Sequence, residues 1–148
     1  MERALVVVEP TAESKALARK AGTFAECTAA TIVLIHATTD EEYAARKQAM
    51  SSIASSEGTY TTDDAREGAE RFAQDVAAEV LSEFGVEYET VGYVGDKGDV
   101  ILDAADEYDC DHVFLSGRKR SPAGKALFGD ATQQVLLEYD GPVTVVTN

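Results

Sequence analysis

Continuous apolar runs recur along this chain, and they predict strands that are buried on both faces of a parallel sheet. The five predicted strands span residues 4–8, 31–35, 86–94, 112–116 and 143–147, of which 86–94 shows partial alternation instead of a continuous run. The second run closes with His36 and Ala37. Between successive runs, apolar residues recur every three or four positions, which is the spacing of a helix with one buried face. A strand, a helix and a parallel strand form a right-handed crossover.

Four helices are expected in the intervals between the strands. The first follows Thr11, a predicted N-cap, and has apolar residues along one face. The positions expected to be buried on it are Ala16, Leu17, Ala21 and Phe24. The second helix has apolar residues at four-residue steps and stops at Gly85. Those residues are Phe72, Val76, Val80 and Phe84.

The third helix starts at Asp96, a predicted N-cap with Asp99 three residues further on. The residues expected to be buried on it are Val100, Ala104 and Tyr108. The fourth helix spans residues 130–139 and ends before a Gly-Pro pair. Residues 38–62 have the least regular pattern: a helix over 41–54 fits the sequence, and 55–59 predicts a break.

Five strands alternating with four helices predict an α/β fold with a doubly wound, five-stranded parallel sheet. Such sheets bind ligands beyond the carboxyl ends of the strands, at the point where the strand order reverses. The turns after the first and fourth strands are expected to meet there. The last strand, Val143–Thr147, should lie at a sheet edge, and exposed apolar edges are usually paired. We therefore expect a two-fold homodimer joined along this strand.

The length of 148 residues fits a single domain over 1–148, and an apolar fraction of 45% can form a full core. No stretch approaches the roughly 20 apolar residues that span a bilayer, so we expect a soluble, cytoplasmic protein and no membrane partner. Cys27 and Cys110 have no zinc-ligand spacing around them. Both are expected to be buried as small hydrophobic residues.

The charge balance is strongly acidic, with 27 Asp and Glu against 13 Lys and Arg and a formal net charge of -14. Such a surface repels phosphodiester backbones, so nucleic acid is not expected as a partner. The acidic residues are spread along the chain, which resembles the surface of a protein from a high-salt cytoplasm. Strong salt would screen the self-repulsion.

The segment 116–134 nevertheless concentrates positive charge. It contains four of the thirteen basic residues, namely Arg118, Lys119, Arg120 and Lys125. Gly117 and Gly129 allow backbone amides to approach a ligand closely, and the start of the following helix favours negative charge. The segment is therefore either an anion-binding loop or a loop whose charges are only solvated.

Residues for catalysis are sparse. The candidate hydroxyls are Ser116, Ser121 and Thr132, and the candidate bases are His36 and His112. No Ser-His-Asp order, nucleophile elbow or Walker lysine motif is visible. His36 could reach the crevice at its strand's carboxyl end, or it could be a structural histidine bonded to a backbone group. We name no catalytic residue.

The chain resembles the universal stress protein family in its small, single-domain form, and the resemblance covers essentially all 148 residues. ATP-binding members carry Gly, two residues, Gly, nine residues, then Gly followed by Ser or Thr, between the fourth strand and the last helix. Gly117 matches the first of these glycines and Gly129 the third, with Thr132 shortly after it. The segment 141–145, Gly-Pro-Val-Thr-Val, resembles the family's closing strand.

Several positions depart from the family pattern. Arg120 stands where the second glycine belongs, eight residues before Gly129, and Asp130 replaces the phosphate-contacting Ser. A carboxylate at a helix start repels phosphate, although Asp130 could instead be an N-cap with Gln133 three residues on. Glu9 replaces an Asp on the adenine side of the pocket.

Three further positions complete the comparison with the family. Val7 lies where many members have Pro, two residues before that acidic position, and Ala37 lies where a small apolar residue lines the adenine pocket. Lys97, before Gly98, stands where a Pro is frequent.

The resemblance implies a three-layer, Rossmann-like sandwich of the adenine nucleotide hydrolase type. It implies a homodimeric stress-response module that binds ATP or AMP as a regulatory ligand, with Mg²⁺ if the ligand is ATP. The alternatives are a dimeric adaptor that has lost the nucleotide and a weak ATPase. The implied nucleotide contacts are Val7, Glu9, Thr11, Ala37, Ser116, Gly117, Arg118, Lys119, Arg120, Gly129, Asp130, Ala131 and Thr132.

Overall fold

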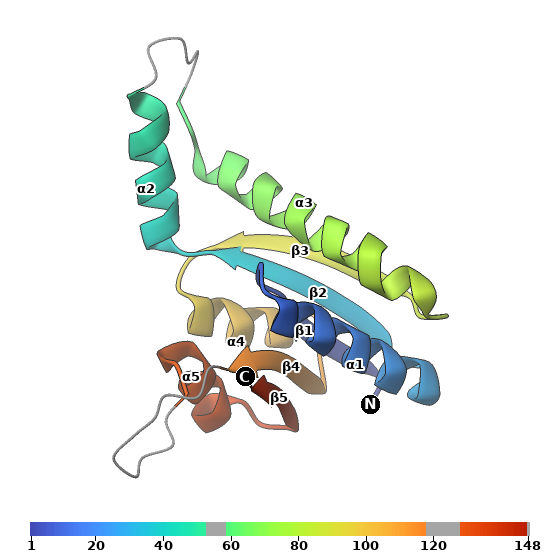
Figure 1. Ribbon diagram of the computed structural model, residues 1–148. Helices are drawn as coiled ribbons and strands as arrows, with labels where there is room; N and C mark the ends of the chain where they lie inside the picture. The colour runs from blue at the N-terminus through green and yellow to red at the C-terminus, as the bar shows by residue number, and fades with distance from the viewer. Residues whose placement is uncertain (53–58, 118–127, 148) are drawn as a thin grey trace.

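A computed structural model describes residues 1–52, 59–117 and 128–147 of the chain. Its centre is a five-stranded, fully parallel sheet with the strand order β3-β2-β1-β4-β5 (Figure 1). The strands are β1 (Arg3–Val7), β2 (Thr31–Thr38), β3 (Tyr88–Val94), β4 (His112–Gly117) and β5 (Val143–Thr147). The predicted doubly wound α/β fold is confirmed.

Helices cover both faces of the sheet, which gives three layers (Figure 1). The helices are α1 (Ala12–Thr28), α2 (Asp40–Ser51), α3 (Thr62–Val80), α4 (Lys97–Glu107) and α5 (Asp130–Glu138). A short 3₁₀ turn, η1 (Leu81–Glu83), extends α3. Helices α1 and α3 pack on one face, and α4 and α5 pack on the other.

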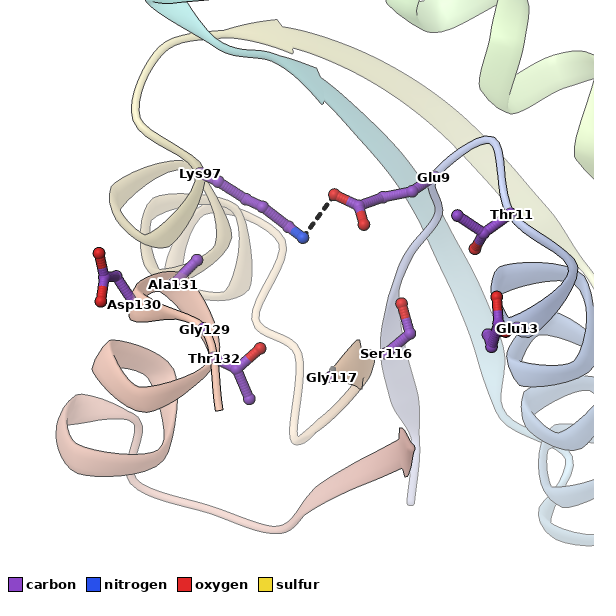
Figure 2. A pocket seen from close by; sticks show the side chains of 10 residues that line it. All are labelled: Glu9, Thr11, Glu13, Lys97, Ser116, Gly117, Gly129, Asp130, Ala131 and Thr132. Atoms are coloured by element: carbon purple, nitrogen blue, oxygen red, sulfur yellow. Dashed lines mark ion pairs between the residues drawn. The ribbon is translucent and has the colours of Figure 1, made fainter. Parts of the chain in front are cut away.

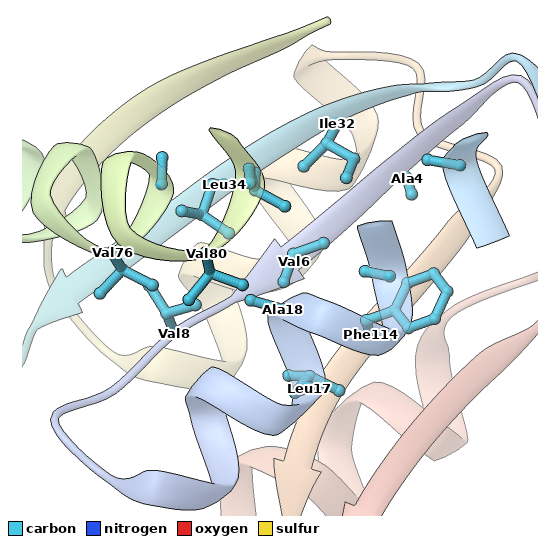
Figure 3. Packing of buried hydrophobic residues seen from close by; sticks show 14 of the residues in the cluster. Ala4, Val6, Val8, Leu17, Ala18, Ile32, Leu34, Val76, Val80 and Phe114 are labelled. Atoms are coloured by element: carbon cyan, nitrogen blue, oxygen red, sulfur yellow. The ribbon is translucent and has the colours of Figure 1, made fainter. Parts of the chain in front are cut away.

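The alternation of side chains along each strand divides the core into two clusters. On β1, Val6 faces α1 and α3, whereas Leu5 and Val7 face α4 and α5. Figure 3 shows the first cluster, in which Leu17 from α1 and Val80 from α3 pack over β1. Because both faces are covered, the inner strands β1, β2 and β4 are largely apolar, and this is why their sequences show runs rather than alternation.

The strand order places the reversal of the sheet between β1 and β4. These strands are hydrogen-bonded neighbours, with Ala4 opposite His112 and Val6 opposite Phe114. The turns that follow β1 and β4 therefore meet at one edge of the sheet, as predicted. Strand β5 pairs with β4 and lies at the end of the sheet order.

The predicted buried face of α1 was wrong by about one residue. Ala16 is exposed and Phe24 is 44% exposed, whereas Ala18 and Ala25 are buried together with Leu17 and Ala21. The ring of Phe84 lies against Gly22 and occupies the space that a larger residue on α1 would need. Small residues therefore form the contact face, and Phe24 lies at its rim.

Helix α3 also ends earlier than the four-residue spacing predicted. It stops at Val80, the chain continues through the 3₁₀ turn, and Phe84 has extended backbone angles. Phe84 still packs against the cluster on the α1 side of the sheet. The apolar spacing therefore identified a core residue correctly but placed it in the wrong element.

Helix α2 lies in the segment whose pattern was least regular. It spans Asp40–Ser51, begins with a capping box between Thr39 and Glu42, and buries none of its residues. A helix without a buried face has no apolar periodicity, so the sequence signal was weak. Residues 53–58, which include most of the predicted break, lie outside the described residues.

The two cysteines differ in exposure, so the prediction that both are buried was wrong for one of them. Cys110 is buried between α4 and β4, whereas Cys27 lies exposed in the last turn of α1. Cys27 follows the buried Ala25 by two residues, which places it on the outer face of the helix. Neither thiol is in a disulfide within the described part of the chain.

We expect a thiol reagent such as iodoacetamide to label Cys27 in the native protein and to leave Cys110 unlabelled. Burial raises the pKa of the Cys110 thiol to about 11, and the thiolate is the reacting form. Mass spectrometry at about pH 8, below the pKa of that buried thiol, should show a single adduct before denaturation and a second one after it. A second adduct on the native protein would contradict the burial of Cys110.

Across the described ranges, no helix has the length and apolar character that crossing a membrane requires.

Candidate functional site

A cavity of about 260 Å³ lies at the carboxyl ends of β1 and β4, where the strand order reverses (Figure 2). Its walls come from the turn after β1, the end of β4 and the first residues of α4 and α5. The residues that line it are Glu9, Thr11, Glu13, Lys97, Ser116, Gly117, Gly129, Asp130, Ala131 and Thr132. This is the crevice that the sequence predicted between two turns.

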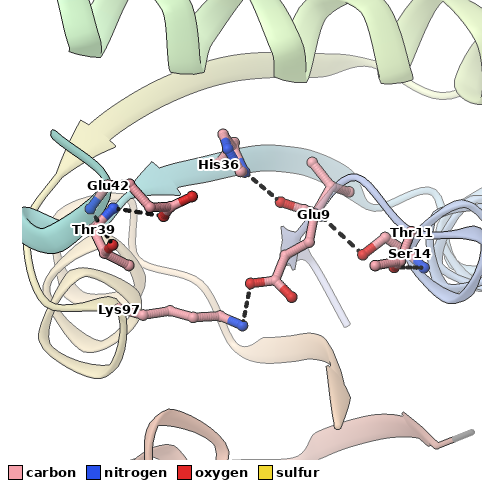
Figure 4. Close-up of polar contacts among 8 residues, drawn as sticks. Glu9, Thr11, Ser14, His36, Thr39, Glu42 and Lys97 are labelled. Atoms are coloured by element: carbon pink, nitrogen blue, oxygen red, sulfur yellow. Dashed lines mark hydrogen bonds and ion pairs between the residues drawn. The ribbon is translucent and has the colours of Figure 1, made fainter. Parts of the chain in front are cut away.

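Hydrogen bonds fix the turn between β1 and α1 (Figure 4). The backbone amide of Thr11 donates to the Glu9 carbonyl at 2.7 Å, and the Glu9 amide donates to Ser14 Oγ at 2.8 Å. Thr11 is the N-cap of α1, as predicted, because its Oγ1 accepts from the Ser14 amide at 3.1 Å. The turn thus presents the Glu9 side chain to the cavity without using its carboxylate.

The Glu9 carboxylate is instead paired with Lys97. Lys97 Nζ lies 2.5 Å from Glu9 Oε1, and the two side chains are 22% and 34% exposed. Lys97 is the first residue of α4, whose predicted N-cap, Asp96, accepts from the Asp99 amide at 3.1 Å. The pair joins the α4 start to the β1 turn across the cavity (Figures 2 and 4).

Helix α5 starts without a side-chain cap. Its N-cap is Gly129, and among the described residues no side-chain cap hydrogen bond is present at this helix start. The interpretation of Asp130 as an N-cap was therefore wrong: Asp130 is the first helical residue and is exposed. Gln133 does not complete a capping box either, because its Nε2 donates to the Phe128 carbonyl at 3.0 Å.

The two glycines of the site have different roles. A Cβ on Gly117 would lie 3.0 Å from the side chains of Phe128 and Val145, so β4 ends in a close contact that favours glycine. Gly129 has ordinary backbone angles, and a Cβ there would meet no described atom within 4 Å. A small residue at Gly129 keeps the first-turn amides of α5 accessible.

Helices α4 and α5 are held together next to the cavity. The side chain of Gln134 lies against Gly98, where a Cβ would collide with it, and Gln134 Nε2 donates to Asp99 Oδ1 at 2.7 Å. Thr132 is 3% exposed at the back of the cavity. The two helix starts therefore face the cavity as one wall.

The structure brings together eight of the residues expected to contact a nucleotide. These are Glu9, Thr11, Ser116, Gly117, Gly129, Asp130, Ala131 and Thr132. Val7 and Ala37 lie in the core cluster under α4 and do not line the cavity. Arg118, Lys119 and Arg120 lie outside the described residues.

Sequence reasoning missed Glu13 and Lys97 as lining residues. Glu13 is in the first turn of α1, where an acidic residue is ordinary for a helix start, so no signal marked it. Lys97 was noted only as a departure from the family pattern. Its place beside Glu9 follows from the sheet order and could not be derived from spacing.

Both histidines are outside this cavity. His36 Nδ1 lies 2.7 Å from the Val8 carbonyl and its ring packs at a tilt against that of Phe72, so the structural alternative for His36 holds. His112 Nε2 lies 2.8 Å from Thr144 Oγ1 at the opposite, amino-terminal end of β4. Burial lowers the pKa of His112. Neither ring reaches the site.

No group of three or more His, Cys, Asp or Glu side chains in the described part of the chain could hold a metal ion. Among the described residues, the charged side chains of the cavity wall are Glu9, Glu13, Asp130 and Lys97. The residues described here can therefore offer an entering molecule one ammonium group, hydroxyls and the uncapped amides of α5.

Comparison with solved structures shows the same fold at low sequence identity. The hypothetical protein MJ0577 has a TM-score of 0.73 at 16% identity, covering 99% of this chain and 96% of that one. A universal stress protein in complex with cAMP has a TM-score of 0.64 at 17% identity, covering 99% and 96%. The Archaeoglobus fulgidus universal stress protein in complex with dAMP has 0.61 at 17%, covering 99% and 98%.

Comparison of sequences points in the same direction. A universal stress protein of Mycolicibacterium smegmatis (strain ATCC 700084 / mc(2)155) is 37% identical over 84 residues, which are 56% of this chain. The aligned part spans 64% of that relative, less than two thirds of its length. The model of the universal stress protein family matches residues 1–147. The chain therefore belongs to the universal stress protein family.

Proposed function

We propose that this protein is a homodimeric stress-response module that binds an adenine nucleotide, ATP or AMP, as a regulatory ligand. The observation that carries the proposal is the cavity between the β1 turn and the start of α5. It lies where doubly wound sheets bind ligands. The solved structures of family members with cAMP and dAMP support a nucleotide of this class.

The start of α5 is suited to a phosphate group. Gly129 has no side chain to cap the helix, no cap hydrogen bond comes from a described side chain, and the helix dipole adds positive potential at this end. Asp130 opposes this, but its carboxylate is exposed and points away from Glu9 and Ser116 (Figure 2). Phosphate can therefore approach the amides from the side of Ser116 and Thr132, whose hydroxyls are donors.

Strand β5 supports the proposed dimer. It is hydrogen-bonded to β4 and ends the sheet order, and Val143 to Val146 are only partly buried. An apolar edge of this kind is stabilised when it pairs with another strand, and a two-fold axis along Val143–Thr147 provides one.

The adaptor without nucleotide is the second candidate, and one observation favours it. Three carboxylates, Glu9, Glu13 and Asp130, line the cavity, and they lower the affinity for an anion. In this candidate the cavity stays free of nucleotide and the protein acts through surface contacts. A weak ATPase would in addition need a group that holds Mg²⁺ and a group that positions water.

Thermal unfolding with and without ATP and Mg²⁺ tests the proposal. In high salt, a ligand at about 100 times its Kd stabilises the folded state by about 2.7 kcal/mol, which raises Tm by several degrees. We expect Tm to rise with ATP or AMP. Sodium sulfate added to the same ionic strength should leave Tm unchanged. A folded dimer whose Tm does not respond to either nucleotide would support the adaptor.

A further inference from the structure

Two departures from the family pattern are in contact in this structure. Glu9 stands where the family has Asp, and Lys97 stands where a Pro is frequent, 88 positions later in the chain. Their side chains form an ion pair at 2.5 Å across the cavity. A proline could not make this contact, so the ion pair depends on both departures together.

The ion pair differs from the other two in the described part of the chain. The side chains of Lys15 and Glu79 are 43% and 52% exposed, and those of Arg66 and Asp63 are more exposed still. Lys97 and Glu9 are 22% and 34% exposed, so water screens their charges less. A partly desolvated ammonium interacts more strongly with any anion that comes within reach.

Lys97 is also the only cationic residue on the described part of the cavity wall. Its side chain runs from the first position of α4 into the space between Glu9 and the start of α5 (Figure 2). The four-carbon stem can rotate its ammonium from one partner to another without movement of the backbone. An anionic ligand in this cavity therefore meets Lys97 as an available counter-charge.

We propose that Lys97 recognises the phosphate of the bound ligand and that Glu9 holds its ammonium group in the cavity until the ligand arrives. This inference rests on the proposed nucleotide function. On binding, the ammonium exchanges the Glu9 carboxylate for a phosphate oxygen, and one charge-assisted contact replaces another. The released carboxylate of Glu9 accepts hydrogen bonds from the hydroxyl or amino groups of the nucleoside part.

The ligand class follows from this exchange. A nucleoside without phosphate leaves the ion pair between Glu9 and Lys97 intact and gains nothing from Lys97. A nucleoside phosphate gains the lysine contact and the contact with the freed carboxylate. The site should therefore prefer AMP and ATP over adenosine, and the preference should depend on Lys97.

Calorimetric titration of adenosine, AMP and ATP at one fixed, high salt concentration tests the inference. The proteins are the wild type, Lys97→Met, Lys97→Arg and Glu9→Gln. Lys15→Met serves as the matched control, because it removes a lysine of a different ion pair on the opposite face of the sheet. Thermal unfolding of every variant without ligand shows whether its fold is intact.

We expect Lys97→Met to weaken AMP binding at least tenfold, which corresponds to about 1.4 kcal/mol, and to leave adenosine binding within about twofold, below the effect of one contact. Lys97→Arg should retain most of the AMP affinity because it retains the charge. Glu9→Gln should leave adenosine binding within about twofold, because the nucleoside leaves the ion pair intact and takes no contact from the Glu9 carboxylate. Lys15→Met should change none of these values.

Two results would overturn the inference. An equal loss of adenosine and AMP affinity in Lys97→Met, or no loss at all, would show that Lys97 does not recognise the phosphate. The proposed nucleotide function would still stand. A wild-type protein that binds none of the three ligands would remove the nucleotide function, and the role of Lys97 with it. The wild-type titration thus separates the two failures.

Discussion

Replacing Phe114 with Ala should lower the free energy of unfolding by about 3–5 kcal/mol, the usual cost of removing a buried aromatic ring. Phe114 is 0% exposed in the middle of β4 and packs in the cluster under α1. Its ring centroid lies 5.8 Å from that of Phe24 and 4.4 Å from that of His112. Truncation leaves a cavity that these neighbours cannot fill without moving α1. Urea unfolding in high salt measures the change.

Leu137→Ala is the matched control for this substitution. It also truncates an apolar side chain to Ala, but Leu137 is 83% exposed, so its free energy of unfolding should change by less than about 0.5 kcal/mol. Phe114→Leu should fall between the two, because it retains part of the buried volume. Equal effects of Phe114→Ala and Leu137→Ala would contradict the packing of β4 under α1.

The inner strands β1, β2 and β4 could be predicted because burial on both faces makes a strand largely apolar. Strand β5 was placed at its observed bounds, and β1, β2 and β4 differed by a few residues at their ends. The meeting of the turns after β1 and β4, and the place of β5 at a sheet edge, followed from general rules for doubly wound folds. These features depend on local composition and on topology, and a single sequence contains both.

The helix faces could be predicted less well. The buried face of helix α1 consists mostly of small residues, so composition alone did not separate the exposed Ala16 from the buried Ala18. Part of this face is set by Phe84, which is distant in sequence and lies against Gly22. Helix α2 has no buried residue and hence no pattern to detect. In both cases the deciding contact, or its absence, is tertiary.

The candidate site, too, could be predicted from the sequence only in part. Glycines and the turns after β1 and β4 mark it in the sequence, and the structure brings them to one cavity. The role of Lys97 could not be predicted, because nothing near it in sequence shows that α4 starts opposite Glu9. The wrong interpretation of Asp130 has a similar origin: the cap position shifted by one residue, to Gly129.

Gly68 and Gly92 have different surroundings that the sequence alone does not distinguish. Gly68 lies inside α3, and a Cβ there would meet no described atom within 4 Å. Gly92 lies in β3, and a Cβ there would collide with the backbone of α3 at Arg66 and Glu70. Helix α3 therefore approaches β3 so closely that only hydrogen fits at position 92.

We therefore expect the same substitution to have opposite effects at these two glycines. Gly92→Ala should destabilise the protein by roughly 3 kcal/mol, because backbone atoms, unlike side-chain ends, cannot rotate away. Gly68→Ala should stabilise it by about 0.5–1 kcal/mol, the difference in helix propensity between Gly and Ala. Urea unfolding of both variants in high salt measures the two signs. If Gly92→Ala did not change the free energy of unfolding, α3 would have to lie further from β3. The close approach would then no longer account for the small buried residues of α3, which are Ala65, Ala69 and Ala73.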